Sequence, residues 1–366
     1  MQNNQNIKTT ALTMALIYVG IILGAGFASG AEIMAYFVEF GLPGIWGLIL
    51  ACTLFALGGW AIWHICDTTG VRDYKAFMDI TMGTWFARIM EAVLGLFMFI
   101  IFAAMLAATG SALHEGFGIN YLLSVCIVAA VCFFTFLFGI SGIIKLNAYI
   151  SPVLIVGCMI IGIFTFVVRT EPAFAIAERS AALLRADWHI SAITYVGYNI
   201  IGAVVILPSL IRVIHNKPRA NTGKRVDGAL KPALFSGIIL FALGLSLFLP
   251  LSTNLHVVDG AQIPMLTLAL RHGHIWGYIF MMLFLAACFT TAATNGYAVA
   301  ATIDGRYPMS NTKKILLKIV ICVLGVLAAL AGFSNFVRVI YPLFAIAGVM
   351  EIALIVKYFI ALKIKM

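Results

Sequence analysis

The first apolar segment of this 366-residue chain carries residue types suited to binding a small ligand through the backbone. Its middle reads Leu23-Gly-Ala-Gly-Phe-Ala-Ser-Gly30, and Glu32 follows closely. Closely spaced glycines favour an unwound backbone, and Ser29 followed by Glu32 has the capping-box spacing of a new helix start. We expect a half-helix over 9–23, an extended piece and a second half-helix from about residue 30. The alternative is close packing of small residues against a neighbouring helix.

A break of this kind places backbone groups where a solute can reach them. The N–H groups at the start of a half-helix present a positive dipole end, which suits a carboxylate. Non-helical backbone inside a membrane is tolerated only where it is buried in protein or lines a cavity. The expected substrate contacts in this segment are Ala25, Gly26, Phe27, Ala28, Ser29 and Gly30.

The sixth apolar segment offers a second, softer break at Tyr195-Val-Gly-Tyr-Asn-Ile-Ile-Gly202. There Gly197 and Gly202 bracket the polar Asn199. Tyr195 and Tyr198, with Phe99 and Phe102 of the third segment, are candidate pocket walls. Ordinary helix packing is the alternative for each ring, because the chain contains 27 Phe residues.

The composition requires a membrane protein. The chain is 63% hydrophobic and 10% charged, whereas soluble domains carry about 25% charged residues. Continuous apolar runs predict an all-α protein with about ten transmembrane helices. The first expected span is about 31 residues, which as a straight helix is roughly 46 Å long and exceeds the apolar core of about 30 Å. The expected spans are 9–39, 42–65, 86–113, 119–139, 147–168, 190–214, 231–251, 273–301, 315–333 and 337–361.

The net charge of +9 is a topology signal. With a cytoplasmic N-terminus, all but five of the 23 Lys and Arg residues fall on the inner side, which predicts that both termini are cytoplasmic. The polar N-terminal residues have no cleavage-site pattern, so we expect no removable signal peptide. A basic inner loop over 212–231 follows from the same rule, so we expect no nucleic-acid partner. The five outer residues are Arg169, Arg179, Arg185, Arg271 and Arg338.

The sequence offers no enzyme signature. None of the seven cysteines forms a CxxC pair, and no Walker A sequence occurs. His272 and His274 flank a glycine in an expected outer loop, where a solvated turn is the simpler interpretation and a metal role the alternative.

The two expected breaks open the two halves of the chain, 9–168 and 190–361, within one transporter domain. Five spans is an odd number, so the halves have opposite orientation. Interrupted hydrophobic segments at matching positions of inverted halves are typical of a secondary-transporter binding site.

These motifs resemble a known family. The run Gly20-Ile-Ile-Leu-Gly-Ala-Gly-Phe27 resembles the first-helix G-x-x-x-G-x-G of sodium-coupled LeuT-fold transporters. The segments GAGFASGAEI (24–33) and TYVGYNIIGA (194–203) are similar to the YkvI-like bacterial branch of the amino acid–polyamine–organocation superfamily. The resemblance implies a 5+5 inverted repeat, alternating access in a bacterial-type inner membrane, and a central site between spans one, three, six and eight.

The resemblance also implies a sodium site. Ala287, Thr290 and Thr291 form an A-x-x-T-[ST] arrangement in the eighth span, and positions i, i+3 and i+4 share a helix face. In sodium-coupled members this motif binds Na⁺ together with carbonyls of the first-helix break, here those of Gly20 and Leu23. The alternative is that the threonines only hydrogen-bond between helices.

Proton coupling is the other possibility within transport. Proton-coupled relatives often carry a Lys in the fifth span, but 147–168 has no ionisable residue and Lys145 lies at its cytoplasmic mouth. Intramembrane carboxylates are functional candidates by default. Glu32 is either the capping-box carboxylate or a substrate, proton or gate residue, with Arg338 as a candidate partner; Glu351 either satisfies groups within the bundle or lines the inner exit.

The sequence therefore predicts a secondary active transporter, a sodium symporter of a small zwitterionic solute such as an amino acid. The alternatives are a proton-coupled amino acid or amine carrier and a ligand-sensing membrane subunit that does not transport. Neither an enzyme nor an organic cofactor is expected.

Overall fold

The protein is an assembly of helices whose computed structural model describes residues 11–138, 141–167, 186–214, 228–307 and 309–364. Each of the predicted apolar segments lies on a helix or a run of helices. Six helices are long and apolar enough to cross a membrane, among the residues described. The helices that correspond to the predicted spans, in chain order, are α1–α3 (Ala11–Ile22, Ala25–Ala28, Ala31–Tyr36), α4 (Pro43–Thr69), α6 (Thr84–Phe117), α7 (Tyr121–Phe138), α8 (Ser141–Val167), α9 (Trp188–Ile214), α10 (Leu230–Thr253), α13 (His274–Arg306), α14 (Asn311–Ala329) and α15–α16 (Phe333–Asn335, Tyr341–Ile364).

Short elements connect these helices. A 3₁₀ turn, η1 (Val38–Phe40), follows α3, and a π-helical turn, η3 (Phe336–Ile340), joins α15 to α16. The helix α5 (Tyr74–Met82) precedes α6, and Asp73 caps it by accepting the Ala76 N–H at 2.9 Å. The helices α11 (Leu255–Val258) and α12 (Pro264–Arg271) lie between α10 and α13.

The first span is broken, as the glycine-rich sequence predicts. Helix α1 ends at Ile22, and Gly24 is extended with ψ of 178°. The short helix α2 follows, and Gly30 then takes a φ of +79°, which an L-residue with a side chain adopts only at a cost. A Cβ at Gly30 would also lie 2.8 Å from Met265 Cγ. The second half of this span therefore begins as α3 at Ala31.

The second predicted break is wrong. Helix α9 runs without interruption through 195–202. Gly197 instead lets two helices touch, because a Cβ at Gly348 of α16 would lie 1.7 Å from the Gly197 carbonyl oxygen. Asn199 is satisfied inside the helix, where its Nδ2 donates to the Tyr195 carbonyl at 2.9 Å. Small-residue packing accounts for the glycine that suggested an unwound backbone.

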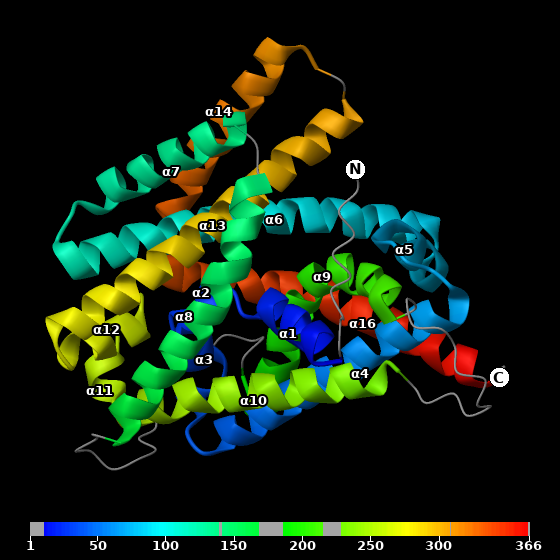
Figure 1. Ribbon diagram of the computed structural model, residues 1–366, viewed down its shortest axis with the longest axis horizontal. Helices are drawn as coiled ribbons and strands as arrows, with labels where there is room; N and C mark the ends of the chain where they lie inside the picture. Colours follow the sequence, from blue (N-terminus) through cyan, green and yellow to red (C-terminus); the bar gives the residue numbers. More distant parts are fainter. Residues whose placement is uncertain (1–10, 139–140, 168–185, 215–227, 308, 365–366) are drawn as a thin grey trace, which may run out of the picture.

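The broken span lies inside the bundle (Figure 1). Helix α1 packs against α9 and α10, and α2 contacts α6, α8 and α13. The helices α4, α9 and α16 pack against one another on one side, whereas α6 and α13 form the largest helix–helix contact on the other. The break is therefore surrounded by helices from both halves of the chain.

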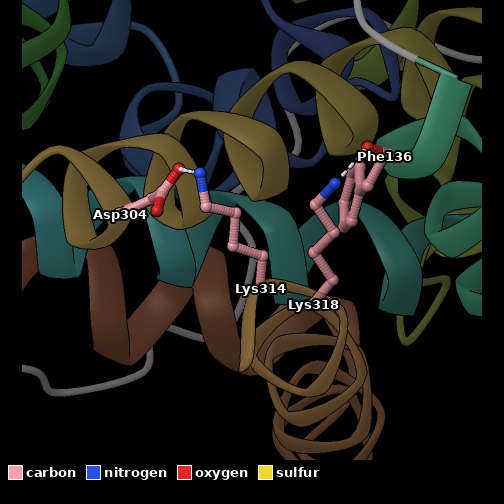
Figure 2. Close-up of polar contacts among 4 residues, drawn as sticks. All are labelled: Phe136, Asp304, Lys314 and Lys318. Atoms are coloured by element: carbon pink, nitrogen blue, oxygen red, sulfur yellow. Dashed lines mark hydrogen bonds and ion pairs between the residues drawn. The ribbon is translucent and has the colours of Figure 1, made fainter. Parts of the chain in front are cut away.

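The helices α7 and α14 lie side by side at one edge of the bundle (Figure 1). Two lysines of α14 attach this helix to α7 and to α13, as Figure 2 shows. Lys318 Nζ donates to the Phe136 carbonyl near the end of α7 at 2.6 Å, and Lys314 Nζ pairs with Asp304 of α13 at 2.9 Å. A lysine at a helix C-terminus satisfies a carbonyl that has no helical partner.

Candidate functional site: a cavity at the break in the first span

A cavity of about 320 Å³ opens beside the break. This volume is at the lower end of the range for small-ligand pockets, about 300–1,000 Å³. Its walls come from the end of α1 and the break, from α6, from α9, from α13 and from the first residue of α16. The predicted residues that line it are Gly20, Leu23, Ala25, Gly26, Glu32, Tyr198, Asn199, Gly202, Ala287 and Thr291.

The break leaves two backbone carbonyls of α1 without a helical partner. In an unbroken helix the Gly24 N–H would donate to Gly20, but here it donates to Ile22 at 3.0 Å. The Leu23 N–H donates to Val19 at 2.8 Å. Within the described chain, no backbone N–H donates to the carbonyl of Gly20 or Ile21. Both residues line the cavity. These oxygens are available to a cation or to a hydrogen-bond donor.

Glu32 of α3 directs its carboxylate back over the break. The residue is 6% exposed and lines the cavity. A Cβ at Gly26 would lie 2.1 Å from Glu32 Oε1, so only glycine leaves room for the carboxylate in this position. Glu32 Oε2 makes no hydrogen bond to the described residues. The side chains of Tyr195, Tyr198 and Tyr341 interact electrostatically with the Glu32 carboxylate.

The capping-box role predicted for Glu32 is wrong. In a capping box the glutamate would accept the Ser29 N–H, but this N–H donates to the Ala25 carbonyl at 2.9 Å. Ser29 Oγ accepts the Ala31 N–H at 3.0 Å and donates to the Gly26 carbonyl at 2.6 Å. Gly30, not Ser29, is the N-cap residue of α3. The Glu32 carboxylate is therefore not a helix cap, and it lines the cavity.

Four residues predicted as substrate contacts lie on the far side of the break. Phe27 and Ala28 face a narrow crevice against α8 and α10. Ser29 and Gly30 turn toward α12, where the Met265 N–H donates to the Ser29 carbonyl at 2.9 Å. The short helix α2 presents only one face to the cavity, and Ala25 and Gly26 occupy that face.

Two aromatic residues predicted as pocket walls are buried elsewhere. Phe102 packs against Phe136 of α7, with ring centroids 6.0 Å apart, and fills the space beside Gly325 of α14. Tyr195 packs edge-on against Phe37 and Phe55, behind Tyr198. Phe99 lines a separate cleft between α5, α6 and α13.

Sequence reasoning missed several lining residues. Leu94, Met98, Ile101 and Met105 recur at intervals of three or four residues, which places them on one face of α6. The same spacing links Thr291, Thr294 and Asn295 of α13. The signal for both faces is helical periodicity, which identifies a shared face but not the direction in which it points. The remaining lining residues not predicted are Ile21, Ile22, Gly24, Phe97, Val205, Ile206 and Tyr341.

The predicted sodium ligands lie in two environments. Gly20, Leu23, Ala287 and Thr291 share the cavity wall. Thr290 is fully buried away from the cavity, and its hydroxyl donates to the Ala287 carbonyl at 3.0 Å. No group of three or more His, Cys, Asp or Glu side chains suited to a metal occurs in the part of the chain that the structure describes. Apart from the Glu32 carboxylate, the oxygens on the described cavity wall belong to backbone carbonyls, hydroxyls and side-chain amides.

Two further charged candidates lie away from the cavity. Arg338 does not pair with Glu32; its Nη1 contacts Glu39 Oε1 of η1 at 2.5 Å. Glu351 of α16 is 1% exposed, and its Oε2 makes no hydrogen bond to the described residues. It lies near Tyr74 of α5, whose pKa is raised by burial and by the charges of Glu351 and Glu91.

Comparison with known proteins confirms the resemblance drawn from the sequence. No family model matches the chain. It is 25% identical over 342 residues to the uncharacterized membrane protein YkvI of Bacillus subtilis (strain 168), covering 92% of each chain. It is 22% identical over 351 residues to the protein YyaD of the same strain, covering 96% of this chain and 97% of the relative.

Solved structures show the fold. The inward-facing conformation of Mhp1 matches with a TM-score of 0.64 and 18% identity over 96% of this chain and 76% of Mhp1. A Na⁺-coupled sialic acid symporter in a substrate-bound outward-open state matches with a TM-score of 0.55 and 14% identity over 96% of this chain and 78% of the symporter. The chain is thus a multi-pass helical membrane protein with the LeuT fold.

Proposed function

We propose that the protein is a secondary active transporter that carries a small solute by alternating access. The observation that supports this most directly is the cavity at the break, because irregular backbone at membrane depth is tolerated where it lines a cavity or is buried in protein. A Na⁺-coupled sialic acid symporter is among the structural neighbours. The proposed cargo is a small zwitterionic solute, such as an amino acid, in a cell membrane with both termini cytoplasmic.

We propose sodium as the coupling ion. The carbonyl of Gly20 lacks a backbone donor, and Leu23, Ala287 and Thr291 line the same cavity. Sodium is a hard cation, and uncharged carbonyl and hydroxyl oxygens are sufficient ligands for it. No other cofactor is part of the proposal.

The test is uptake by purified protein in proteoliposomes. A panel of radiolabelled amino acids and amines is offered with an inward Na⁺ gradient, and again with Na⁺ replaced by choline at the same pH. We expect accumulation above the external concentration that disappears when the Na⁺ gradient is collapsed. Binding without accumulation of any solute would contradict transport and favour the ligand-sensing alternative.

A proton-coupled carrier is the second candidate, and Glu32 is the observation that favours it. A buried carboxylate with an oxygen that makes no hydrogen bond is the kind of group that carries a proton through a membrane. Glu32 lines the cavity and Glu351 does not, so Glu32 is the carrier to test. Under proton coupling, an inward pH gradient drives uptake in choline buffer and Glu32→Gln abolishes that response; under sodium coupling, uptake follows Na⁺ alone.

A further inference from the structure

Three aromatic rings form a cluster beside the Glu32 carboxylate. Phe97 of α6, Tyr198 of α9 and Tyr341 of α16 all line the cavity. Their ring centroids are 6.4 Å apart for Phe97 and Tyr198, 6.1 Å for Phe97 and Tyr341, and 5.1 Å for Tyr198 and Tyr341. The three rings come from three different helices, so the fold rather than the local sequence brings them together.

The charged side chain on the described cavity wall is negative. Glu32 is the one acidic side chain on this described wall, which contains no Lys, Arg or His. Polar side chains nearby direct donors to their own helices: Asn295 Nδ2 to the Thr291 carbonyl at 2.9 Å, and Thr294 Oγ1 to the Thr290 carbonyl at 2.7 Å. Asn199 Nδ2 donates in the same way within α9. These three donors are therefore satisfied within their own helices, and the Glu32 carboxylate is the charged group on the described wall.

We infer that this corner of the cavity binds the cationic head of the solute, an ammonium group held between the Glu32 carboxylate and the faces of Phe97, Tyr198 and Tyr341. A carboxylate satisfies the charge and the N–H donors of an ammonium. Aromatic faces attract a cation through their negative quadrupole, and more strongly where water is excluded. The inference rests on the proposed function and narrows its substrate class to solutes with a protonated amine.

Gly26 keeps this corner open. A side chain there would meet Glu32 Oε1, so the glycine permits the carboxylate to lie against the break instead of pointing away from it. The same break exposes the α1 carbonyls near Gly20, which are separate acceptors for the coupling ion. The ammonium and the sodium ion therefore have different sets of oxygens in one cavity.

The experiment measures binding, which does not depend on transport. Purified protein in detergent is screened by thermal shift against amines, each paired with its hydroxyl isostere and its carboxylate analogue, for example phenethylamine, 2-phenylethanol and 3-phenylpropionate, together with amino acids and quaternary amines. Stabilising compounds are then titrated by calorimetry against wild type, Glu32→Gln and Phe97→Leu. Phe99→Leu is the matched control, because this ring lies two residues away on α6 and faces a different cleft.

We expect every stabilising compound to carry a cation. The dissociation constant should rise on the order of 30-fold or more in Glu32→Gln and about fivefold in Phe97→Leu, with no change in Phe99→Leu. Stabilisation by compounds that carry no cationic group, equal binding of the amine by Glu32→Gln, or no stabilising compound at all would overturn the inference. Loss of Na⁺ stabilisation in Glu32→Gln would also overturn it, because Glu32 would then bind the coupling ion.

Failure of this inference and failure of transport are distinguishable. Binding of amines that depends on Glu32, without accumulation in proteoliposomes, leaves the ammonium site standing and contradicts the transporter. Na⁺-driven accumulation of a solute without an amine would support the transporter and contradict the ammonium site. If Glu32→Gln does not fold, the Phe97→Leu and Phe99→Leu pair decides the outcome, since both changes keep an apolar side chain on the same helix.

Discussion

Arg338 Nη1 contacts Glu39 Oε1 at 2.5 Å, and this ion pair joins the end of the first broken span to the start of the last. Glu39 is 5% exposed at its side chain, whereas Arg338 is 31% exposed. In the predicted topology both residues lie toward the outer side. Arg338 also lines a small cavity of about 180 Å³ with Ala31, Met34, Val337 and the 258–261 turn. The pair therefore connects η1 at the end of the first span to η3 at the start of the last one.

Breaking this pair should open the outer side. In Arg338→Ala the buried Glu39 carboxylate loses its cation, which favours a state in which water reaches it. We expect faster labelling of Met34→Cys by a membrane-impermeant maleimide in whole cells, in a background without the native cysteines. The charge-swapped double variant Glu39→Arg/Arg338→Glu should restore slow labelling. Equal labelling rates with and without Arg338 would show that the pair does not hold this side closed.

The break in the first span was predictable because two independent signals agree on it. The glycines at 24, 26 and 30 permit unusual backbone, and the segment is too long for one straight crossing. The helix ends within one residue of the expected position, at Ile22. The exact cap was not predictable, because Ser29 has the correct spacing to Glu32 but its hydroxyl bonds Gly26 and Ala31 instead.

The second break could not be judged from the sequence because glycine has two uses in a membrane helix. Gly197 and Gly202 have the spacing of an unwound segment, but the deciding contact is made by Gly348, far away in the chain. Phe102 and Phe97 illustrate a related limit. Both lie on α6 at membrane depth, and only the packing of Phe102 against α7 shows which ring faces the cavity.

The contact between Gly197 and Gly348 predicts an effect on the stability of the protein. Alanine at position 348 would place its Cβ 1.7 Å from the Gly197 carbonyl oxygen, so α9 and α16 must separate. Overpacking of this kind costs about 1–3 kcal/mol. We expect a lower Tm for Gly348→Ala in detergent. Gly95→Ala of α6 is the control, since nothing lies within 4 Å of the position of its Cβ. Its free energy of unfolding should stay within about 0.5 kcal/mol of wild type, so its Tm should change little.

The Na⁺ dependence of uptake should depend on the Thr291 hydroxyl. This residue lines the cavity, as Ala287 does, and in the proposed sodium site its hydroxyl binds the ion together with the α1 carbonyls. We expect Thr291→Ala to raise the Na⁺ concentration for half-maximal uptake by roughly tenfold, as the loss of one oxygen ligand implies. Thr302→Ala on the same helix is the control, because its exposed hydroxyl only donates to the Ala298 carbonyl at 2.8 Å. An unchanged Na⁺ dependence in Thr291→Ala would contradict the sodium site.

Gly26→Ala should weaken solute binding through Glu32, although alanine adds only one methyl group. The Cβ would lie 2.1 Å from Glu32 Oε1 and 3.0 Å from its Cδ, so the carboxylate must leave the break. Alanine is compatible with the helical conformation of α2, so we expect the protein to fold and its solute affinity to fall by tenfold or more, on the order of 1.4 kcal/mol. Gly58→Ala of α4, whose Cβ would lie 3.6 Å from Ile200 Cδ1, is the matched control and should bind normally. Because Glu32 is the group displaced, the effect of Gly26→Ala should vanish in a Glu32→Gln background, and additive losses in the double variant would show that Gly26 acts by another route.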